Sequence, residues 1–365
     1  MNQLRVAFDV GPLVGPRTGV GQAVAGMRAS LGNLDGLEIS EYITSFRTKP
    51  PEGAHRLPIP AAAAHRLWSI SRRPPLDRFL GRPDVVHGTN YVVPPCRAAQ
   101  VVTVYDCWFL RHPSLANRDV NRAGRVLRRA VEQGATVHAS STNTAAEIGD
   151  LFPGARTVTI PLAAVPVPKP ATQPPVPALV DRRYIAAIGT LERRKNIPVL
   201  IDAFGVLAGD DDDMLLVLAG ADGDDREAIN AAIDRLDPAV ARRVVLTGRI
   251  DEPSRSWLLR NASVLAYPSL DEGFGFPLLD AMQIGLPIVA SNRGSIPEVC
   301  GAAGLLCEPD DVGALAANLA TAASDDVTRS RLLAAADEQL AAFSWSRCAA
   351  DLGALYRRLA DERAA

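Results

Sequence analysis

The stretch Ser263-Val-Leu-Ala-Tyr-Pro-Ser-Leu-Asp-Glu-Gly-Phe-Gly-Phe-Pro-Leu-Leu-Asp280 joins an apolar run, a glycine-rich turn and an amphipathic segment. The apolar run predicts a buried strand, and Pro277 suits the first turn of a helix. The stretch therefore predicts a strand–turn–helix unit of an α/β domain, with its turn at the carboxyl end of the strand.

The same turn carries groups that can bind a ligand. Gly273 and Gly275 let the backbone approach a ligand closely, and the free N–H groups of a helix start can receive an anion. Glu272 in the turn and Asp280 in the first helical turn are expected to reach one pocket, where carboxylates accept hydrogen bonds from paired hydroxyls. On the evidence of this turn alone, a helix cap or a solvated acidic loop is an equally good interpretation of the two acids as a ligand site.

Short apolar runs alternate with longer helical patterns along the whole chain, which predicts parallel sheets covered by helices. The predicted strands are Leu4–Val10, Asp84–His87, Val101–Tyr105, Thr136–Ala139, Tyr184–Ile188, Met214–Ala219, Arg243–Thr247, Ser263–Tyr267 and Pro287–Ser291. We therefore expect two doubly wound, Rossmann-like α/β domains that face a central cleft, with ligand bound at strand carboxyl ends.

A proline-rich segment over 165–180 separates the two sets of strands and predicts an interdomain linker. The expected domains are 1–164 and 181–344, and the second is expected to bind the ligand of the acidic turn. The residues 345–365 are expected to form a helix that packs back on the first domain.

A second loop, Gly189-Thr-Leu-Glu-Arg-Arg-Lys-Asn196, follows another predicted strand. Arg193, Arg194 and Lys195 are three cations before a helix that Asn196 is expected to cap. Such a cluster predicts a diphosphate receptor, because charged hydrogen bonds each contribute roughly 1.5–3 kcal/mol. A solvated basic loop is the alternative.

Composition places limits on partners and compartment. The chain has 365 residues, of which 47% are hydrophobic and 22% charged, with a formal net charge of −2, so bulk attraction to nucleic acid is not expected. Its five cysteines are scattered without C-x-x-C spacing, which predicts neither a disulfide framework nor a thiolate zinc site. With no secretion signal or membrane span in the sequence, a cytoplasmic location is expected.

Near the start, glycines at 11, 15, 19 and 21 follow the first predicted strand. Their spacing departs from G-x-G-x-x-G, so a dinucleotide cofactor is not expected. We interpret this loop as a lip that lines the cleft, with an ordinary strand-to-helix turn as the equal alternative.

Together these motifs resemble glycosyltransferase family 4, whose members are retaining, nucleotide-sugar-dependent enzymes of the GT-B fold. The resemblance covers nearly the whole chain and implies that the domain 1–164 lies on the acceptor side. It rests on Thr18–Gly21, Val102–Asp106, Ile188–Asn196, Leu218–Gly220, Leu246–Arg249, Pro268–Met282, Gly285–Ser291 and Pro297–Val299.

The resemblance implies roles for particular residues. Glu272 is expected to contact the donor sugar and Asp280 the nucleotide ribose, although the family typically has a glutamate at the second position. Arg194 and Lys195 are expected to hold the donor diphosphate. The other implied donor-binding residues are Gly273, Phe274, Gly275, Phe276, Thr190, Arg249, Gly19 and Tyr105. Thr190 stands where many members place the diphosphate arginine, and Tyr105 where relatives commonly have histidine.

The implied reaction moves a hexose, with mannose from GDP-mannose favoured, to a hydroxyl of a glycan, a glycolipid or a small molecule. The alternatives are a GT-B-type sugar-nucleotide epimerase or phosphorylase, and a non-catalytic sugar-nucleotide-binding protein. No cofactor is expected besides the nucleotide sugar, which is a substrate.

Two further patterns bear on metals and membranes. Asp222-Gly-Asp224 has the D-x-D spacing of some metal-dependent transferases, but it follows a strand and precedes a helix, so we interpret it as a polar loop and expect no catalytic metal. The segment 118–129 places arginines at helical spacing and predicts either peripheral contact with anionic lipid or a solvated helix face.

Overall fold

The computed structural model describes residues 3–15, 18–45, 48–71, 73–209 and 213–364. The chain forms two compact units. The first unit comprises Met1–Ala163 and Phe343–Ala365, and the second comprises Ala164–Ala342.

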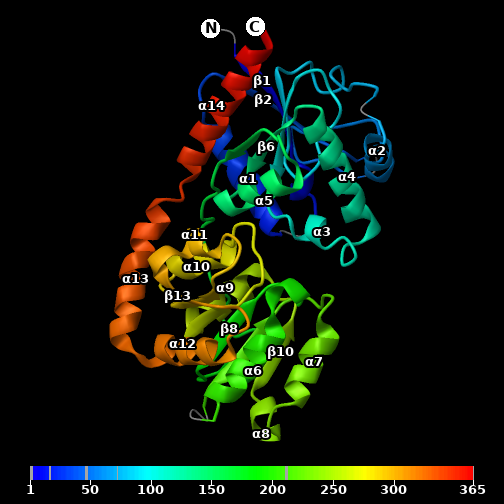
Figure 1. The fold of residues 1–365 in the computed structure, drawn as a ribbon. Coiled ribbons are helices and arrows are strands. Elements are labelled where there is room, and N and C mark those ends of the chain that lie inside the picture. The colour runs from blue at the N-terminus through cyan, green and yellow to red at the C-terminus, as the bar shows by residue number, and fades with distance from the viewer. Residues whose placement is uncertain (1–2, 16–17, 46–47, 72, 210–212, 365) are drawn as a thin grey trace. The chain divides into compact units, whose positions relative to one another are not determined.

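The first unit, in which Figure 1 labels β1, β2 and β6, is built on a parallel sheet of seven strands in the order β3-β2-β1-β4-β5-β6-β7. Its strands are β1 Leu4–Asp9, β2 Leu37–Ile43, β3 His55–Arg56, β4 Val85–Gly88, β5 Ala99–Val104, β6 Thr136–Ala139 and β7 Thr157–Thr159. Its helices are α1 Gly19–Leu31, α2 Ala61–Trp68, α3 Trp108–Arg111, α4 Arg118–Glu132, α5 Thr142–Leu151 and α14 Trp345–Ala364, with a 3₁₀ turn η1 at Gly11–Leu13. Helix α1 packs beside α14, and α2 beside α4.

The second unit has a parallel sheet of six strands in the order β10-β9-β8-β11-β12-β13. Its strands are β8 Tyr184–Ile188, β9 Leu215–Ala219, β10 Val244–Gly248, β11 Val264–Tyr267, β12 Ile288–Ser291 and β13 Gly304–Cys307. Its helices are α6 Ile197–Leu207, α7 Arg226–Asp234, α8 Pro238–Ala241, α9 Glu252–Asn261, α10 Phe276–Gln283, α11 Ile296–Cys300, α12 Val312–Ser324 and α13 Asp326–Ala341. Three 3₁₀ turns complete it: η2 Pro177–Leu179, η3 Arg193–Lys195 and η4 Gly301–Ala303.

Burial explains why these sheets form where the apolar runs lie. Every residue of β8, β9 and β11 is buried, as expected for parallel strands covered by helices on both faces. Each unit has its own apolar core between sheet and helices. The predicted fold class of two Rossmann-like α/β domains is therefore confirmed.

The proline-rich segment differs from the expected linker. It lies in the second unit and is bonded to it, because Ala171 N donates to Pro253 O at 2.9 Å and Ser256 Oγ donates to Pro168 O at 2.6 Å. A segment whose backbone is paired in this way is part of a domain surface.

Helix α14 docks on the first unit through a buried polar chain. His138 Nε2 donates to Ile160 O at 2.9 Å, which fixes its tautomer because a carbonyl can only accept. Thr103 Oγ1 then links His138 Nδ1, at 3.0 Å, to His87 Nε2, at 2.7 Å, and the Tyr356 hydroxyl donates to His87 Nδ1 at 2.6 Å. Both ring nitrogens of each histidine in this network have a hydrogen-bond partner, so burial of the two imidazoles costs little free energy.

Candidate active site

The candidate site lies at the topological switch point of the second sheet, between β8 and β11. Strands β8 and β11 are adjacent and parallel, but β8 leads to β9 on one side whereas β11 leads to β12 on the other. The loops that follow β8 and β11 diverge at this switch point, and such points bind ligands in doubly wound sheets.

The two loops are tied together by backbone and amide hydrogen bonds. Leu270 N donates to Arg194 O at 2.8 Å. Asn196 Nδ2 donates to Pro268 O at 3.2 Å and to Pro309 O at 2.7 Å. The expected capping role of Asn196 is therefore wrong in its detail: Asn196 does precede α6, in a left-handed conformation with φ of 55°, but its side chain joins loops and makes no cap bond.

A buried ion cluster occupies this point. Lys195 Nζ donates to Glu272 Oε1 at 2.5 Å, and Arg194 Nη1 donates to Glu272 Oε2 at 2.7 Å. The side chains are only 8% exposed for Glu272, 13% for Lys195 and 16% for Arg194. The predicted acidic and cationic loops thus meet at one place.

Electrostatics keep this carboxylate ionised. Burial acts to raise the pKa of Glu272, but the charges of Lys195 and Arg194 outweigh it and lower that pKa to about 2. The ring of Tyr267, which ends β11, lies 4.9 Å from Lys195 Nζ and so adds a cation–π contact. Tyr267 is a site residue that the motif reading missed, although it lies inside the quoted stretch.

Asp280 has a different partner from Glu272. Its buried carboxylate is ion-paired with Arg255 on α9, and burial raises its pKa despite that pair. Asp280 is the fifth residue of α10, so it lies in the second turn of that helix and not in the first. The two acids therefore do not share one set of partners, and a ribose contact would compete with Arg255.

The glycine turn provides the backbone start of α10. Gly275 is its N-cap with φ of 94°, a conformation that strains residues with a Cβ. Phe274 and Phe276 are buried and pack edge to face, with their ring centroids 5.2 Å apart, so most of their ring surface contacts the protein.

A further glycine holds the acidic turn from the next loop. Gly294 follows β12 and has φ of 58°. A Cβ built there would lie 2.6 Å from Glu272 N and 2.7 Å from Glu272 O, and Ser295 N donates to Glu272 O at 2.9 Å. The loop after β12 thus fixes the backbone of Glu272, which sequence reasoning did not predict.

Two other predicted residues lie at the carboxyl edge of the same sheet. Thr190 is exposed and lies two residues after the end of β8. Arg249 is exposed after β10, which is two strands away from β8 at the sheet edge. Thr190 is therefore close to the ion cluster along the chain, whereas Arg249 would have to reach it across β9.

The two predicted residues of the first unit have local roles. Gly19 is the first residue of α1, whose start is capped by Thr18 Oγ1, which accepts from Gly21 N at 3.2 Å. The buried Tyr105 hydroxyl donates to Thr89 O at 2.7 Å. Since a phenol has one hydrogen to donate, Tyr105 can donate to a ligand only by giving up this bond, whereas its oxygen can still accept a hydrogen bond from a sugar hydroxyl.

Sequence reasoning also missed Asp9, the last residue of β1. Strands β1 and β4 form the switch point of the first sheet, and Thr89 Oγ1, just beyond β4, donates to Asp9 O at 2.8 Å. The Asp9 carboxylate accepts from Gly11 N at 2.9 Å, and burial raises its pKa to about 7. An acid at the end of the first strand, two residues before a glycine, was the available signal.

Asp9 leads to a prediction for stability against pH. Because its folded pKa of about 7 exceeds its ordinary 3.8, its contribution to stability is fully present below pH 3.8 and is lost as pH rises through about 7. Asp9→Asn stays neutral and keeps an oxygen for Gly11 N. At pH 8 we expect the free energy of unfolding of the variant to exceed that of the wild type by roughly 1–3 kcal/mol. Near pH 4 the two free energies of unfolding should be equal. Urea unfolding at both pH values checks this, and an equal difference at both would contradict it.

Within the described ranges, no group of three or more His, Cys, Asp and Glu side chains is placed to hold a metal ion. In the D-x-D segment, Asp224 Oδ1 accepts from Arg193 N at 2.9 Å and Asp222 pairs with Arg226 at 2.6 Å. These carboxylates stabilise the cationic loop and the start of α7.

Comparisons with known proteins agree with this geometry. Residues 182–325 match the domain family described as glycosyl transferases group 1. The chain is 29% identical to O-antigen chain mannosyltransferase B of Escherichia coli, over 94% of this chain and 97% of that protein.

Solved structures show the same fold. A sucrose-phosphate synthase from Thermosynechococcus elongatus superposes with a TM-score of 0.74 at 20% identity, over 98% of this chain and 99% of that one. Anabaena HepE in complex with UDP and glucose superposes with a TM-score of 0.68 at 16% identity, over 98% of this chain and 100% of that one.

The fold is therefore GT-B, and the chain is a glycosyltransferase. The resemblance to glycosyltransferase family 4 is confirmed, and the site just described lies within the matched domain.

Proposed function

We propose that the chain is a retaining hexosyltransferase that moves mannose from GDP-mannose to a hydroxyl of a glycan or lipid-linked acceptor, without a metal ion. The observation that carries the donor assignment is the buried cluster of Glu272 with Arg194 and Lys195 at the switch point. The mannosyltransferase relative, which matches nearly the whole chain, supports mannose over other hexoses. The glycosyltransferase comparisons favour transfer over the epimerase, phosphorylase and non-catalytic alternatives.

The cluster is suited to hold a diphosphate. A diphosphate oxygen is the same kind of acceptor as a carboxylate, so Lys195 and Arg194 can exchange Glu272 for the ligand without losing charge pairing. The exchange leaves Glu272 with lone pairs for sugar hydroxyls. Because the site is shielded from water, its cations act on the ligand more strongly than cations in bulk solvent would.

The chemical step follows from where charge develops. The acceptor oxygen attacks the anomeric carbon as the bond to the diphosphate breaks, and the acceptor proton passes to the departing phosphate oxygen. Negative charge then grows on the diphosphate, where Lys195, Arg194 and the N–H groups before α10 stabilise it. Glu272 orients the sugar. No separate base is required.

The test combines binding with product analysis. Purified protein in EDTA is screened against GDP-mannose, UDP-glucose and other nucleotide sugars by thermal shift, since a bound ligand raises stability with the logarithm of its occupancy. We expect the largest shift with GDP-mannose, transfer in EDTA, and an α-linked product by NMR. Transfer only with added metal would refute metal independence, and a β-linked product would refute the retaining mechanism. A larger shift with another nucleotide sugar would refute GDP-mannose as the donor.

We further propose peripheral contact with anionic membranes through α4, on the cytoplasmic side. Arg118 and Arg125 are exposed on this helix, whereas Arg122 pairs with Asp119 at 2.6 Å. Among the described residues, no helix is both long and apolar enough to span a bilayer. Among the described residues the five cysteines form no disulfide with one another, which is compatible with the reducing cytoplasm.

A liposome assay tests this contact. Vesicles containing phosphatidylglycerol are expected to sediment the wild-type protein, and an Arg118→Glu/Arg125→Glu double variant is expected to stay in the supernatant, because each basic residue contributes about 1 kcal/mol. Equal sedimentation of both proteins, or of neither, would refute it.

A further inference from the structure

A pocket lined by arginines lies on the first unit, at the amino ends of β4 and β5. Its volume is about 350 Å³, at the lower end of the range of small-molecule sites. The lining comes from the segment before β4, the residues just before β5, and the last turn of α14. We call it the basic pocket, after Arg82, Arg97 and Arg363, which line it together with Asp77 and Asp84.

The basic pocket is at the opposite edge of the sheet from the substrate edge. Doubly wound sheets bind their substrates at the carboxyl ends of the strands, and Asp9 marks that edge at the end of β1. Asp84 directly precedes β4, and Ala98 directly precedes β5. Because the strands are parallel, these amino ends lie side by side at the other edge. The basic pocket is therefore separate from the substrate edge of the first unit.

The two acids of the basic pocket are bonded to other groups. Asp77 Oδ1 accepts from Arg97 N at 2.7 Å and from Ala98 N at 3.2 Å. Asp84 Oδ2 accepts from Arg5 N at 2.9 Å, and Asp84 Oδ1 lies 3.6 Å from Arg5 Nη2. Asp77 thus fixes the backbone before β5, and Asp84 pairs with an arginine that does not line the pocket.

The three arginines of the pocket lack such partners. Among the residues that the structure describes, no acid is ion-paired with Arg82, Arg97 or Arg363. The end of α14 contributes a partial negative charge of about half a unit, which Arg363 in its last turn offsets. The pocket therefore keeps a positive charge that the described side chains do not neutralise.

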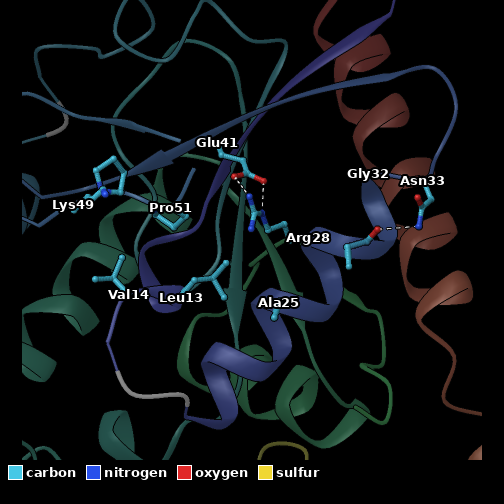
Figure 2. Close-up of a pocket in the computed structure, with 11 residues that line it drawn as sticks. Leu13, Val14, Ala25, Arg28, Gly32, Asn33, Glu41, Lys49 and Pro51 are labelled. Atoms are coloured by element: carbon cyan, nitrogen blue, oxygen red, sulfur yellow. Dashed lines mark hydrogen bonds and ion pairs between the residues drawn. The ribbon is translucent and has the colours of Figure 1, made fainter. Parts of the chain in front are cut away.

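Arginines that line other hollows of this unit do have acid partners. Figure 2 shows Arg28 in a pocket beside α1, where Nε donates to Glu41 Oε1 at 2.5 Å and Nη2 donates to Glu41 Oε2 at 2.8 Å. Arg156 lines a hollow next to the basic pocket and is ion-paired with Glu362 on α14. The uncompensated charge is thus a property of the basic pocket and not of every arginine-lined hollow in the unit.

Arg82 holds its place in the pocket against a backbone preference. Its φ is 52°, in the left-handed region that residues with a Cβ rarely adopt. Arg82 N donates to Asp77 O at 2.7 Å, and this bond closes the turn. Glycine or asparagine would fit such a turn better, and strained residues of this kind gather at ligand sites. The arginine at this position therefore points to a use for its side chain.

The lining selects a compact anion that carries phosphate. Each guanidinium presents a planar fork of N–H donors that matches phosphate oxygens, so several arginines can share one ligand with two phosphate groups. Apart from the charged residues, the described lining is proline and alanine, with no aromatic ring on which a base could stack. A volume of about 350 Å³ also favours a small ligand.

We propose that the basic pocket binds a compact anion with two phosphate groups, which joins the end of α14 to the edge of the first sheet. The anion would neutralise Arg82 and Arg97 beside the strands and Arg363 on the helix. Without it, like charges around one pocket repel one another, so the last turn of α14 should be less stable. The proposal goes beyond the proposed function, because it needs neither the donor loops nor an acceptor.

The main test is titration calorimetry with pyrophosphate. The donor loops are also expected to bind diphosphate, so the titrations use the full-length Lys195→Met protein, in which that second site is weakened. We expect pyrophosphate to bind this protein, and Arg97→Gln added to it to weaken the binding by about 10–150-fold, the equivalent of one charged hydrogen bond. Arg97 is exposed and its backbone bond to Asp77 is kept, so the fold should survive.

Two further variants in the same background separate the pocket from general surface charge and from stability. Arg78→Gln changes an exposed arginine of the same segment outside the lining and should leave pyrophosphate binding unchanged. Arg82→Gly should weaken binding without lowering the unfolding temperature of the free protein, because glycine adopts the turn without strain. No pyrophosphate binding by the Lys195→Met protein, or equal binding by the Arg97→Gln and Arg78→Gln proteins, would overturn the proposal.

Hydrogen exchange tests the link to α14. Pyrophosphate should slow amide exchange in the last turn of α14 in the Lys195→Met protein, and Arg97→Gln should remove this protection. Binding that leaves exchange in α14 unchanged would refute the link between helix and sheet.

A vesicle assay identifies the source of the phosphate. Vesicles containing phosphatidic acid are sedimented with the wild-type and the Arg97→Gln proteins. Weaker sedimentation of the Arg97→Gln protein would support a lipid headgroup as the ligand of the basic pocket. Equal sedimentation, together with the loss of pyrophosphate binding, would support a free anion.

Discussion

Lys195→Met is expected to lower kcat by about 10²–10³-fold, the loss typical when one preorganised group that stabilises developing charge is removed. Methionine keeps an unbranched apolar stem in place of the lysine stem, which packs against Gly189. Glu272 retains its 2.7 Å pair with Arg194 in the variant, so its charge is not left alone in a buried position. The fold should therefore survive.

The control for this variant is Lys169→Met, which changes an exposed lysine of the same unit. Initial rates at saturating donor, together with thermal unfolding, distinguish lost chemistry from lost structure. Near-normal turnover of the Lys195→Met protein would refute the assignment of Lys195 to the donor diphosphate, whatever the stability of that variant.

Gly294→Ala is expected to reduce kcat/KM by about 10²-fold, because a displacement of about 1 Å in a positioned group can cost that much. The added Cβ would lie 2.6 Å from Glu272 N and 2.7 Å from Glu272 O. Both are backbone atoms, so the acidic turn itself must move. Glu272 would then meet Lys195 and Arg194 in altered geometry.

Gly285→Ala is the control that separates the displacement of the acidic turn from the backbone strain of placing alanine at a positive φ. Gly285 has φ of 69° in the same unit, and the nearest atom to an added Cβ is Leu333 Cδ2 at 3.9 Å. Both variants should lose roughly 1–2 kcal/mol of stability through the left-handed conformation, but only Gly294→Ala should lose activity beyond that. Equal activity of the two, measured as kcat/KM with the same donor, would show that Gly294 does not position Glu272.

The central strands could be predicted because parallel strands buried on both faces are continuous apolar runs. Strand β2, Leu37–Ile43, was not predicted, since its sequence Leu-Glu-Ile-Ser-Glu-Tyr-Ile alternates with charged residues and much of it is half-buried. Strands β3 and β7 are edge strands of two and three residues, too short to form a pattern.

The meeting of Glu272 with Lys195 could be predicted because both loops follow strand carboxyl ends of one sheet. The partners of Asp280 and Asn196 could not. Asp280 is bound by Arg255 from α9, and Asn196 by carbonyls of two other loops, and such choices depend on tertiary packing that motif spacing does not encode. The hydrogen bond from the Tyr105 hydroxyl to Thr89 O likewise depends on tertiary packing.

The most direct measurement is calorimetric titration of the wild type and of Lys195→Met with GDP and with guanosine. If the cationic loop holds the diphosphate, the wild type should bind GDP far more tightly than guanosine. Lys195→Met should then weaken GDP binding by about 10–150-fold, the equivalent of one charged hydrogen bond, and leave guanosine binding unchanged. Equal affinity of the two proteins for GDP would contradict the account.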